Sequence, residues 1–405
     1  MSSYERTLAR LFALRRFGVR PGLDAISVAL ARLGDPQRAF DVVHVAGSNG
    51  KGSTSAMIES ILRTDGRHTG LYTSPHLARF TERIRVGGVE LDRDAVAPLY
   101  EEVSAAGPEL TFFELVTAMA FLAFQRAGVE VAVVEVGLGG RLDATNVLPR
   151  TLVSVVTGIA LEHTEILGTT LRAIAREKAG ILRRGVPAIV GAVPDEARAA
   201  ITEVVIEVGA HARWYGSDFH AVDSALLGEH QRRNAAVARE AVLCLATPPG
   251  AHSVARGLAT VRWPGRLELV CDDVLVDGAH NPDGAQALAV ALPEIARGRA
   301  IHLVVAVVED KDARALFEPL LSLASRVYVT TAPSPRARSA ASLASLLTHP
   351  HVIVCVDPHA AVEEARCEGA LCVVAGSLFL VGAVRAHLLG EPVDPIAAQD
   401  PAVRP

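Results

Sequence analysis

The chain has 405 residues, half of them hydrophobic, and its 40 Lys and Arg against 45 Asp and Glu give a formal net charge of −5. This length predicts two or three domains, and the mild negative charge argues against a broad nucleic-acid-binding surface. The sequence has no apolar run of about 20 residues and no signal-peptide block, and its five cysteines are scattered, so we expect a cytoplasmic protein with reduced thiols and no membrane contact.

Short runs rich in β-branched residues recur along the chain, separated by segments with helical periodicity. The first set of runs covers residues 42–45, 69–72, 131–136, 152–156 and 188–190. The second set covers residues 274–276, 301–308, 327–330, 352–356 and 371–374. Apolar runs that do not alternate with polar residues are typical of buried parallel strands. The pattern therefore predicts an α/β fold with mostly parallel sheets.

Proline and glycine punctuate the chain between these two sets of runs. They occur at residues 247–250 and again in Trp263-Pro264-Gly265. Such clusters are typical of linkers between domains. We therefore predict a boundary near residue 265, which divides the chain into domains 1–264 and 265–405 with a cleft between them.

A glycine-rich run follows the first predicted strand and precedes a helix with one apolar stripe. The run is Gly47-Ser48-Asn49-Gly50-Lys51-Gly52-Ser53. Glycines let backbone N–H groups face an anion, and a helix N-terminus adds partial positive charge. We predict a phosphate loop for ATP in which Lys51 reaches the β- and γ-phosphates and Ser53, or less readily Thr54, binds Mg²⁺. Gly52 breaks the strict P-loop spacing, so a plain glycine-rich turn is the alternative.

Three potential metal ligands follow predicted strands. Ser74 comes after the strand at 69–72, Glu135 ends the run at 131–136, and His163 comes after the run at 152–156. The carboxyl ends of parallel strands share one edge of a sheet, and hydroxyl and carboxylate oxygens suit a hard cation. Structural roles for the histidine and the glutamate are the alternatives. The local sequence around Lys178 predicts an exposed lysine on a helix.

In this order, the motifs resemble the Mur ligase superfamily, and most closely the dihydrofolate synthase/folylpolyglutamate synthase family. The resemblance runs from about residue 17 to residue 389. It rests on the phosphate loop, on GLYTSPHLARFTERIR at 70–85 and EVGLGGRLDATN at 135–146, and on shorter motifs at 162–168, 177–180, 230–234, 264–266, 277–282, 310–312 and 376–378. It implies an N-terminal P-loop ATPase domain with a mostly parallel sheet and a smaller Rossmann-like α/β C-terminal domain.

The resemblance also implies roles for individual residues. Ser74, Glu135 and His163 match magnesium ligands, and Lys178 matches a lysine that is carbamylated in the family and could help to hold a second Mg²⁺. The expected catalytic residues are Lys51, Glu135, His163 and Lys178. ATP contacts are expected from Asn234, Arg266, Asp277 and the neighbouring His280. Since Arg266 and Asp277 belong to the second domain, ATP would bridge the cleft.

The pterin end of a folate substrate is expected near three segments. They contain Val19, Arg20 and Pro21, then Thr111 and Phe113, and then Leu142, Asp143 and Ala144. Phe113 could stack on the pterin, or it could be a core aromatic residue. The chain departs from the family at Arg20, at Glu162, where Asp is usual, and at Glu309.

The resemblance implies an ATP-dependent ligase that acts as a monomer on small molecules. A carboxylate of dihydropteroate or of a folate glutamate tail would attack ATP to give an acyl phosphate, and L-glutamate would then form the amide. A Mur ligase acting on a UDP-muramyl peptide, a P-loop ATPase or kinase switch, and a non-catalytic nucleotide-binding relative are the alternatives.

Overall fold

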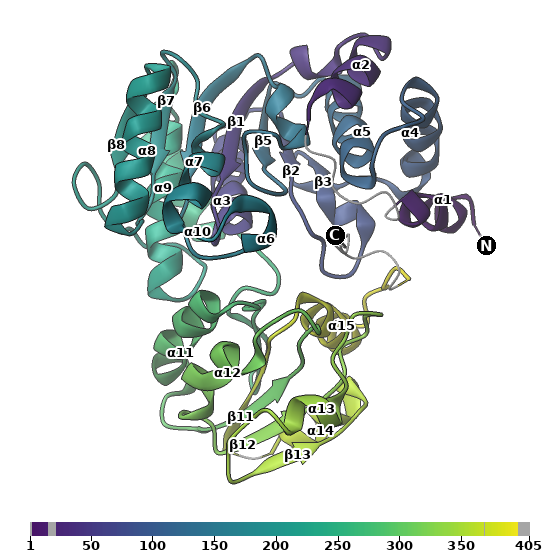
Figure 1. Cartoon of the computed structure of the whole chain (residues 1–405), viewed down its shortest axis with the longest axis vertical. Helices are drawn as coiled ribbons and strands as arrows, with labels where there is room; N and C mark the ends of the chain where they lie inside the picture. Colours follow the sequence, from purple (N-terminus) through teal and green to yellow (C-terminus); the bar gives the residue numbers. More distant parts are fainter. Residues whose placement is uncertain (1, 15–21, 368, 396–405) are drawn as a thin grey trace.

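The computed structural model describes residues 2–14, 22–367 and 369–395 of the chain. They form two α/β units, one above the other in Figure 1, each built on its own sheet. We call them the N-terminal and the C-terminal unit. No helix among the described residues is both long and apolar enough to cross a membrane.

The N-terminal unit contains an eight-stranded sheet in which six strands are parallel. The two antiparallel strands, β3 and β4, lie at one edge. In spatial order the strands are β4 (Val89–Glu90), β3 (Ile84–Val86), β2 (Thr69–Tyr72), β5 (Val131–Glu135), β1 (Asp41–Ala46), β6 (Thr151–Val156), β7 (Pro187–Val190) and β8 (His211–Trp214).

Helices cover both faces of this sheet. Alternate residues of β1 point to opposite faces, so that Val42 packs in one apolar cluster and Val43 in another. One face carries α1 (Ser3–Ala13), α2 (Asp24–Arg32), α4 (Arg93–Ala106), α5 (Phe112–Ala127), α7 (Leu171–Ala179) and α8 (Asp195–Val208). The other carries α3 (Lys51–Thr64), α9 (Glu229–Leu243) and α10 (Ala251–Thr260), and the short α6 (Thr164–Leu167) follows β6. Single-turn 3₁₀ helices span Pro36–Arg38, Phe80–Arg83 and Ala144–Val147.

The C-terminal unit contains a six-stranded sheet that is parallel except at β9. Its spatial order is β13 (Val352–Val354), β12 (Arg326–Val329), β11 (Ala300–Val305), β14 (Ala370–Ala375), β10 (Val274–Val276) and β9 (Glu268–Cys271). One face packs against α11 (Pro282–Ala296), α12 (Ala313–Leu321) and α13 (Ala340–Ala344), and the other against α14 (Pro358–Ala365) and α15 (Leu378–Leu389).

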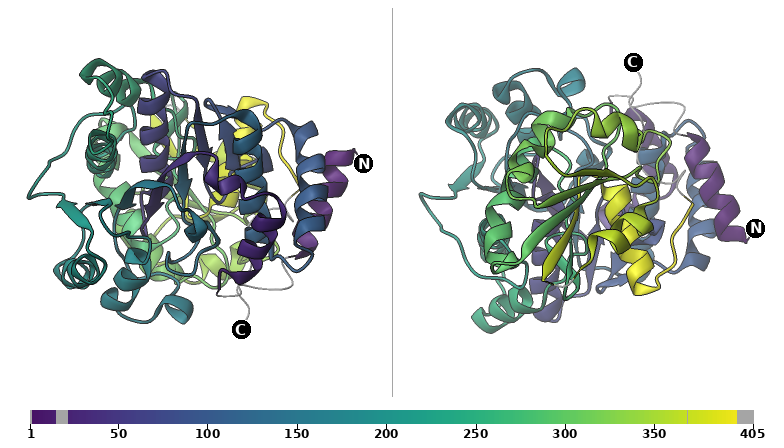
Figure 2. Two further views of the ribbon diagram at one scale, coloured as in Figure 1. Left: turned by 90° about the horizontal axis from the view of Figure 1, so that it is seen from above. Right: turned by 90° about the horizontal axis from the view of Figure 1, so that it is seen from below.

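The predicted α/β fold with two mostly parallel sheets is therefore confirmed. The boundary predicted near residue 265 lies between the last strand of the first sheet and the first strand of the second. The division into 1–264 and 265–405 stays a prediction. After α15 the chain returns to the N-terminal unit, where the yellow segment approaches the purple and blue helices (Figure 2).

Candidate active site

The phosphate loop connects β1 to α3, as the sequence predicts. Gly47 and Gly50 have φ angles of 147° and 85°, which favour glycine. The backbone carbonyl of Asn49 accepts a hydrogen bond of 2.7 Å from the hydroxyl of Thr157, at the end of β6. Lys51 Nζ donates to the carbonyl oxygens of Gly47 and Ser48 at 2.8 and 3.1 Å. Thr157 thus fixes the loop to the end of β6, and the ammonium group of Lys51 lies over the loop.

Glu135 ends β5 and is buried beside this loop. Its Oε2 accepts a 3.0 Å hydrogen bond from the backbone N–H of Ser74. Burial raises the pKa of Glu135 to about 7, although the nearby charges of Lys51 and Arg266 act in the opposite direction. A buried carboxylate whose charge is only partly compensated is a suitable ligand for a cation.

Of the two serines proposed as hydroxyl ligands of Mg²⁺, one lies at the phosphate loop and the other next to Glu135. Ser53 is buried in the first turn of α3, and Ser74 follows β2, the neighbour of β5. No group of three or more His, Cys, Asp or Glu side chains in the described part of the chain could hold a metal by itself. One carboxylate and two hydroxyls instead fit a hard cation that completes its shell with water and phosphate oxygens.

Lys178 is not the exposed helical lysine that its sequence context alone suggests. Only 2% of its side chain is exposed. Its Nζ donates to the carbonyl oxygen of Gly47 at 2.9 Å and pairs with Glu162 at 2.7 Å. Burial lowers the pKa of Lys178 to about 8. Burial alone would raise the pKa of Glu162, but the charges of Lys51 and Lys178 lower it to about 2.

His163 lies beside the charged groups of this site, since Glu162, Lys51 and Lys178 all act on its pKa. The residue precedes α6 with a φ of 47°, and its side chain is exposed. It directly follows Glu162, so the pair with Lys178 holds the backbone before it in place. Ser74, Glu135 and Lys178 are therefore brought to the phosphate loop, and His163 borders them.

Residues of the C-terminal unit meet the phosphate loop directly. Asn49 Nδ2 donates to Asp283 at 2.9 Å, and Asn281 Nδ2 donates to Asn49 Oδ1 at 3.0 Å. Asn281 is the N-cap of α11, so this helix begins next to the loop. The loop therefore lies between the two units.

The candidate ATP residues of the C-terminal unit lie just before α11. The carboxylate of Asp277 accepts hydrogen bonds from the backbone N–H groups of Leu267 and Ala279 at 2.8 and 2.9 Å. His280 Nδ1 lies 2.8 Å from the carbonyl of Gly278, and burial lowers the pKa of His280 to about 4. The ring is therefore neutral at pH 7. A β-carbon on Gly278 would lie 1.8 Å from Arg266 Nη1, so the guanidinium covers this turn.

On the other side of the loop, Asn234 lies next to Gly50. A β-carbon on Gly50 would lie 2.6 Å from Asn234 Oδ1. Asn234 donates to Gln231 at 3.1 Å, and Gln231 donates to the hydroxyl of Ser53 at 3.2 Å. The sequence motif at 230–234 is thus brought to the phosphate loop by α9.

The proposed pterin residues divide into three groups. Val19, Arg20 and Pro21 lie outside the described residues. Thr111 caps α5, and Phe113 is half-buried, with its ring centroid 6.1 Å from that of Tyr72. Phe113 also packs on the loop after β5, because a β-carbon on Gly137 would lie 2.3 Å from its ring.

The third group follows the same loop. Asp143 is buried and accepts hydrogen bonds from Leu138, at 2.9 Å, and from Thr145. Ala144 is buried, and Leu142 is 37% exposed. The structure thus brings Phe113 to the 137–144 segment, within which Leu142 is the exposed member of the proposed set.

Sequence reasoning missed several residues that contact or surround this site, among them Asn281, Asp283 and Thr157, which bond Asn49. Gln231 bonds Ser53, Glu162 pairs with Lys178, and Lys311 of the C-terminal unit adds to burial in lowering the pKa of both His163 and His280. Gln231 and Lys311 lie inside the motifs at 230–234 and 310–312, so the motifs could have indicated both residues. Glu162 was noticed only as a departure from the family.

Comparisons with known proteins agree with this architecture. Residues 45–190 match the Mur ligase middle domain, and residues 265–378 match the family described as Mur ligase, glutamate ligase domain. A folylpolyglutamate synthase of Lacticaseibacillus casei is 33% identical, over 96% of this chain and 99% of its own length.

Two further matches extend this result. A probable bifunctional folylpolyglutamate synthase/dihydropteroate synthase of Haloferax volcanii is 38% identical over 94% of this chain, which spans only 50% of that relative's length. The structure of E. coli FolC in complex with DHPP and ADP superposes with a TM-score of 0.89 at 32% identity, covering 96% of this chain and 98% of that one. The chain therefore belongs to the dihydrofolate synthase/folylpolyglutamate synthase family of the Mur ligases.

Proposed function

We propose that this chain is an ATP-dependent ligase that joins L-glutamate to dihydropteroate, to the γ-carboxylate of folylpolyglutamates, or to both. The observation that carries the proposal is the phosphate loop, which touches Lys178 of one unit and Asp283 and Asn281 of the other. The FolC structure in complex with DHPP and ADP supports nucleotide binding, and the related folylpolyglutamate synthase supports a folate substrate.

The proposed reaction begins with phosphoryl transfer. A substrate carboxylate oxygen attacks the γ-phosphorus of ATP, the bond to the β-phosphate oxygen breaks, and ADP leaves. The amino group of L-glutamate then attacks the acyl carbon, loses a proton, and inorganic phosphate departs as the amide forms. Two anions must approach in the first step, and Lys51 offsets their repulsion from its position over the loop.

The oxygen ligands around Lys51 support a divalent cation. Ser53, Ser74 and Glu135 would hold one Mg²⁺, which would neutralise charge on the transferring phosphoryl group. A related structure from Yersinia pestis was solved with AMPPNP and a Mn ion. We propose a second ion at His163 and a carbamylated Lys178, which the burial of Lys178 next to the loop supports.

Residues of both units would contact the substrates. Asn234 and Gln231 would fix the nucleotide side of the loop, while Arg266, Asp277 and His280 of the C-terminal unit would close over ATP and exclude water. The half-buried Phe113 and the exposed Leu142 would contact the pterin end. We further propose a cytoplasmic monomer with small-molecule partners, and all five cysteines are free, in keeping with a reducing compartment.

One assay tests the proposal. The chain is incubated with ATP, Mg²⁺, L-glutamate and either dihydropteroate or tetrahydrofolate, and ADP release is measured with and without glutamate. We expect glutamate-dependent release that Lys51→Ala abolishes, and hydroxylamine should trap an acyl hydroxamate. ADP release without glutamate would instead indicate an ATPase switch, and release with a UDP-muramyl peptide would indicate a cell-wall ligase.

A further inference from the structure

The loop that carries Ser74 is held by the C-terminal unit as well as by its own. We call residues 73–83 the Ser74 loop. Leu77, three residues after Ser74, packs in the apolar cluster that α15 and the second sheet form. A β-carbon on Gly265 would lie 2.9 Å from Leu77 Cδ1 and 3.1 Å from Val381 Cγ1. We call residues 261–267, between α10 and β9, the linker. A side chain of the N-terminal unit is therefore inserted between the linker and α15.

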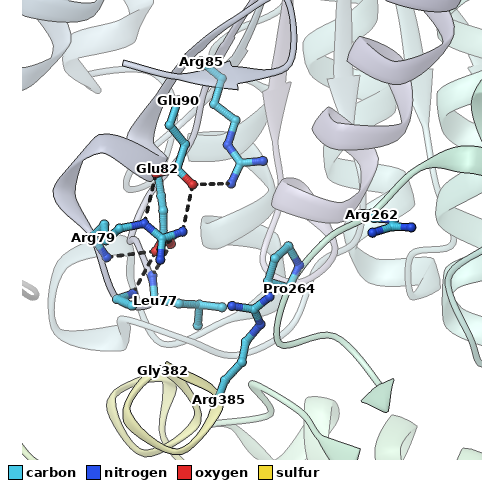
Figure 3. Close-up of a pocket in the computed structure, with 10 residues that line it drawn as sticks. Leu77, Arg79, Glu82, Arg85, Glu90, Arg262, Pro264, Gly382 and Arg385 are labelled. Carbon is cyan, nitrogen blue, oxygen red and sulfur yellow. Dashed lines mark hydrogen bonds and ion pairs between the residues drawn. The ribbon is translucent and has the colours of Figure 1, made fainter. Parts of the chain in front are cut away.

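The backbone of Leu77 also touches α15. A β-carbon on Gly382 would lie 2.2 Å from the carbonyl oxygen of Leu77. Gly382 has an ordinary helical conformation, so this close approach is what requires glycine there. Figure 3 shows Leu77 directly over the turn of α15 that contains Gly382.

A second connection returns from the end of α15. We call residues 391–394 the return segment. The carboxylate of Asp394, which is 4% exposed, accepts a 2.7 Å hydrogen bond from the backbone N–H of Phe80 and a 2.5 Å hydrogen bond from the hydroxyl of Tyr4. Its own N–H donates to the carbonyl of Ala78 at 2.8 Å. Asp394 thus fastens the Ser74 loop to α1.

Ion pairs join the same loop to both units. Arg79 pairs with Glu90 at 3.0 Å and with Glu391 of the return segment at 2.7 Å, and Glu391 also pairs with Arg385 of α15 at 2.8 Å. Arg79, Glu90 and Arg385 border a cavity of about 210 Å³ between the loop, the linker and α15 (Figure 3). Because carboxylates already hold both Arg79 and Arg385, we interpret the cavity as part of an ion-pair junction between the units.

We propose that the return segment and the Leu77 contact position Ser74 for metal binding, so that movement of the C-terminal unit is transmitted to the metal site. Ser74 donates to Glu135, and the turn after it is fixed by Glu82, which accepts from the N–H groups of Leu77, Ala78 and Arg79. The turn therefore moves as one body, and Asp394 is a positioning residue at its far end. This inference rests on the proposed function for the identity of the metal site.

The first test changes Asp394 and reads metal dependence without catalysis. Binding of ADP is measured by calorimetry at increasing Mg²⁺ concentration. In Asp394→Ala we expect the half-saturating Mg²⁺ concentration to rise about tenfold, since a charged hydrogen bond to the loop is lost. Asp394→Asn can still accept from Phe80 and should stay within about threefold of wild type. The exposed Asp272→Ala is the control and should leave the value unchanged.

The second test changes α15, which contacts the Ser74 loop at Leu77. Gly382→Ala places a methyl group against the carbonyl of Leu77 while slightly favouring the helix itself. We expect the same rise in half-saturating Mg²⁺, together with faster amide hydrogen exchange in residues 73–83. Gly250→Ala, where a β-carbon would meet nothing within 4 Å, is the control. The Gly382→Ala variant also tests the inference if Asp394→Ala fails to fold.

The outcomes separate this inference from the proposed function. If both variants keep the wild-type Mg²⁺ dependence and wild-type exchange in the Ser74 loop, the coupling is wrong. If wild-type protein binds Mg²⁺ and ADP but shows no glutamate-dependent ADP release, the proposed reaction is wrong, while the binding and exchange results still decide the coupling.

Discussion

Gly52, the residue that breaks the strict P-loop spacing, lies under the indole of Trp263 in the linker between the units. A β-carbon on Gly52 would lie 3.0 Å from Trp263 Cζ2 and Nε1. The guanidinium carbon of Arg85, a residue of β3, lies 5.5 Å from the centre of the same indole ring. The glycine is therefore explained by the close approach of the linker to the first turn of α3.

This contact predicts a rescue experiment. Gly52→Ala should weaken ADP binding about tenfold, because overpacking of this kind costs about 1–3 kcal/mol. Adding Trp263→Leu should restore much of the affinity by making room for the methyl group. Calorimetry of the single and double variants measures this. Equal loss with and without the tryptophan would mean that Gly52 is needed for another reason.

His44 predicts a pH dependence of stability. It lies fully buried on β1, with Nε2 2.8 Å from the hydroxyl of Thr145, and burial lowers the pKa of His44 to about 3. In the unfolded chain its pKa returns to its ordinary value of 6.5. The unfolded state then binds one more proton between these values, and stability falls by about 1.4 kcal/mol for each pH unit below 6.5.

Replacing this residue should reduce that slope. We expect His44→Gln to be less stable than wild type at pH 7 but to lose less stability between pH 7 and pH 5. Urea denaturation at pH 7, 6 and 5 measures both effects. His252→Gln, at an exposed position, is the matched control. A slope as steep as that of wild type would show that His44 is not neutral in the folded protein.

At the scale of elements, two glycines allow α7 to meet the loop that follows β5. A β-carbon on Gly140 would lie 2.8 Å from the carbonyl of Glu177 and 2.9 Å from that of Lys178. A β-carbon on Gly180 would lie 2.4 Å from Cβ of Arg141. Both glycines serve the same contact, and that contact fixes Lys178 relative to Glu135.

A double-mutant cycle tests this interpretation. Gly140→Ala and Gly180→Ala should each destabilise the protein by about 1–3 kcal/mol and reduce ADP formation. Since each pushes the same two surfaces apart, the double variant should cost clearly less than the sum of the two. Thermal unfolding and turnover measure the cycle. Strict additivity would contradict a shared contact.

The strands that sequence predicted and those that it missed differ in burial. The apolar runs at 131–136 and 371–374 became the fully buried β5 and β14. By contrast, β8 and β9 are short edge strands with polar or exposed residues, and they carry no such signal. The local context of Lys178 indicated an exposed side chain, because Gly47, which accepts its hydrogen bond, lies 131 residues away in the sequence, and only the family resemblance placed Lys178 at the site. Local patterns report which segments are buried, but not which distant partner a side chain meets.

At the scale of the whole molecule, the linker connects three regions: the phosphate loop through Trp263, the Ser74 loop through Gly265, and ATP through the proposed contact of Arg266. The resemblance implied the contact of Arg266 with ATP, but the packing of Trp263 on Gly52 and of Leu77 on Gly265 does not follow from the motifs. The ordered motifs did predict that both units contribute to one site, and the hydrogen bonds between Asn49 and α11 support that prediction.

This position makes Trp263 a reporter of movement between the units. The chain has two tryptophans, so Trp214→Phe leaves Trp263 as the single fluorophore. We expect its emission to change with saturating Mg²⁺ and ATP, since closure alters the packing of its indole. Lys51→Ala should abolish the change at the same ligand concentration. An unchanged emission spectrum in the single-tryptophan protein would argue against a linker that moves.

The contact between Tyr4 and Asp394 also bears on how the chain is made. The two residues are 390 positions apart. At about 5–20 residues per second, α1 leaves the ribosome on the order of 20 to 80 seconds before its partner exists. During synthesis, therefore, the first helix can pack on α4 and α5 but lacks its hydrogen bond to Asp394 until α15 has been made. A chain that refolds from denaturant has no such interval, so the two routes begin from different sets of available contacts.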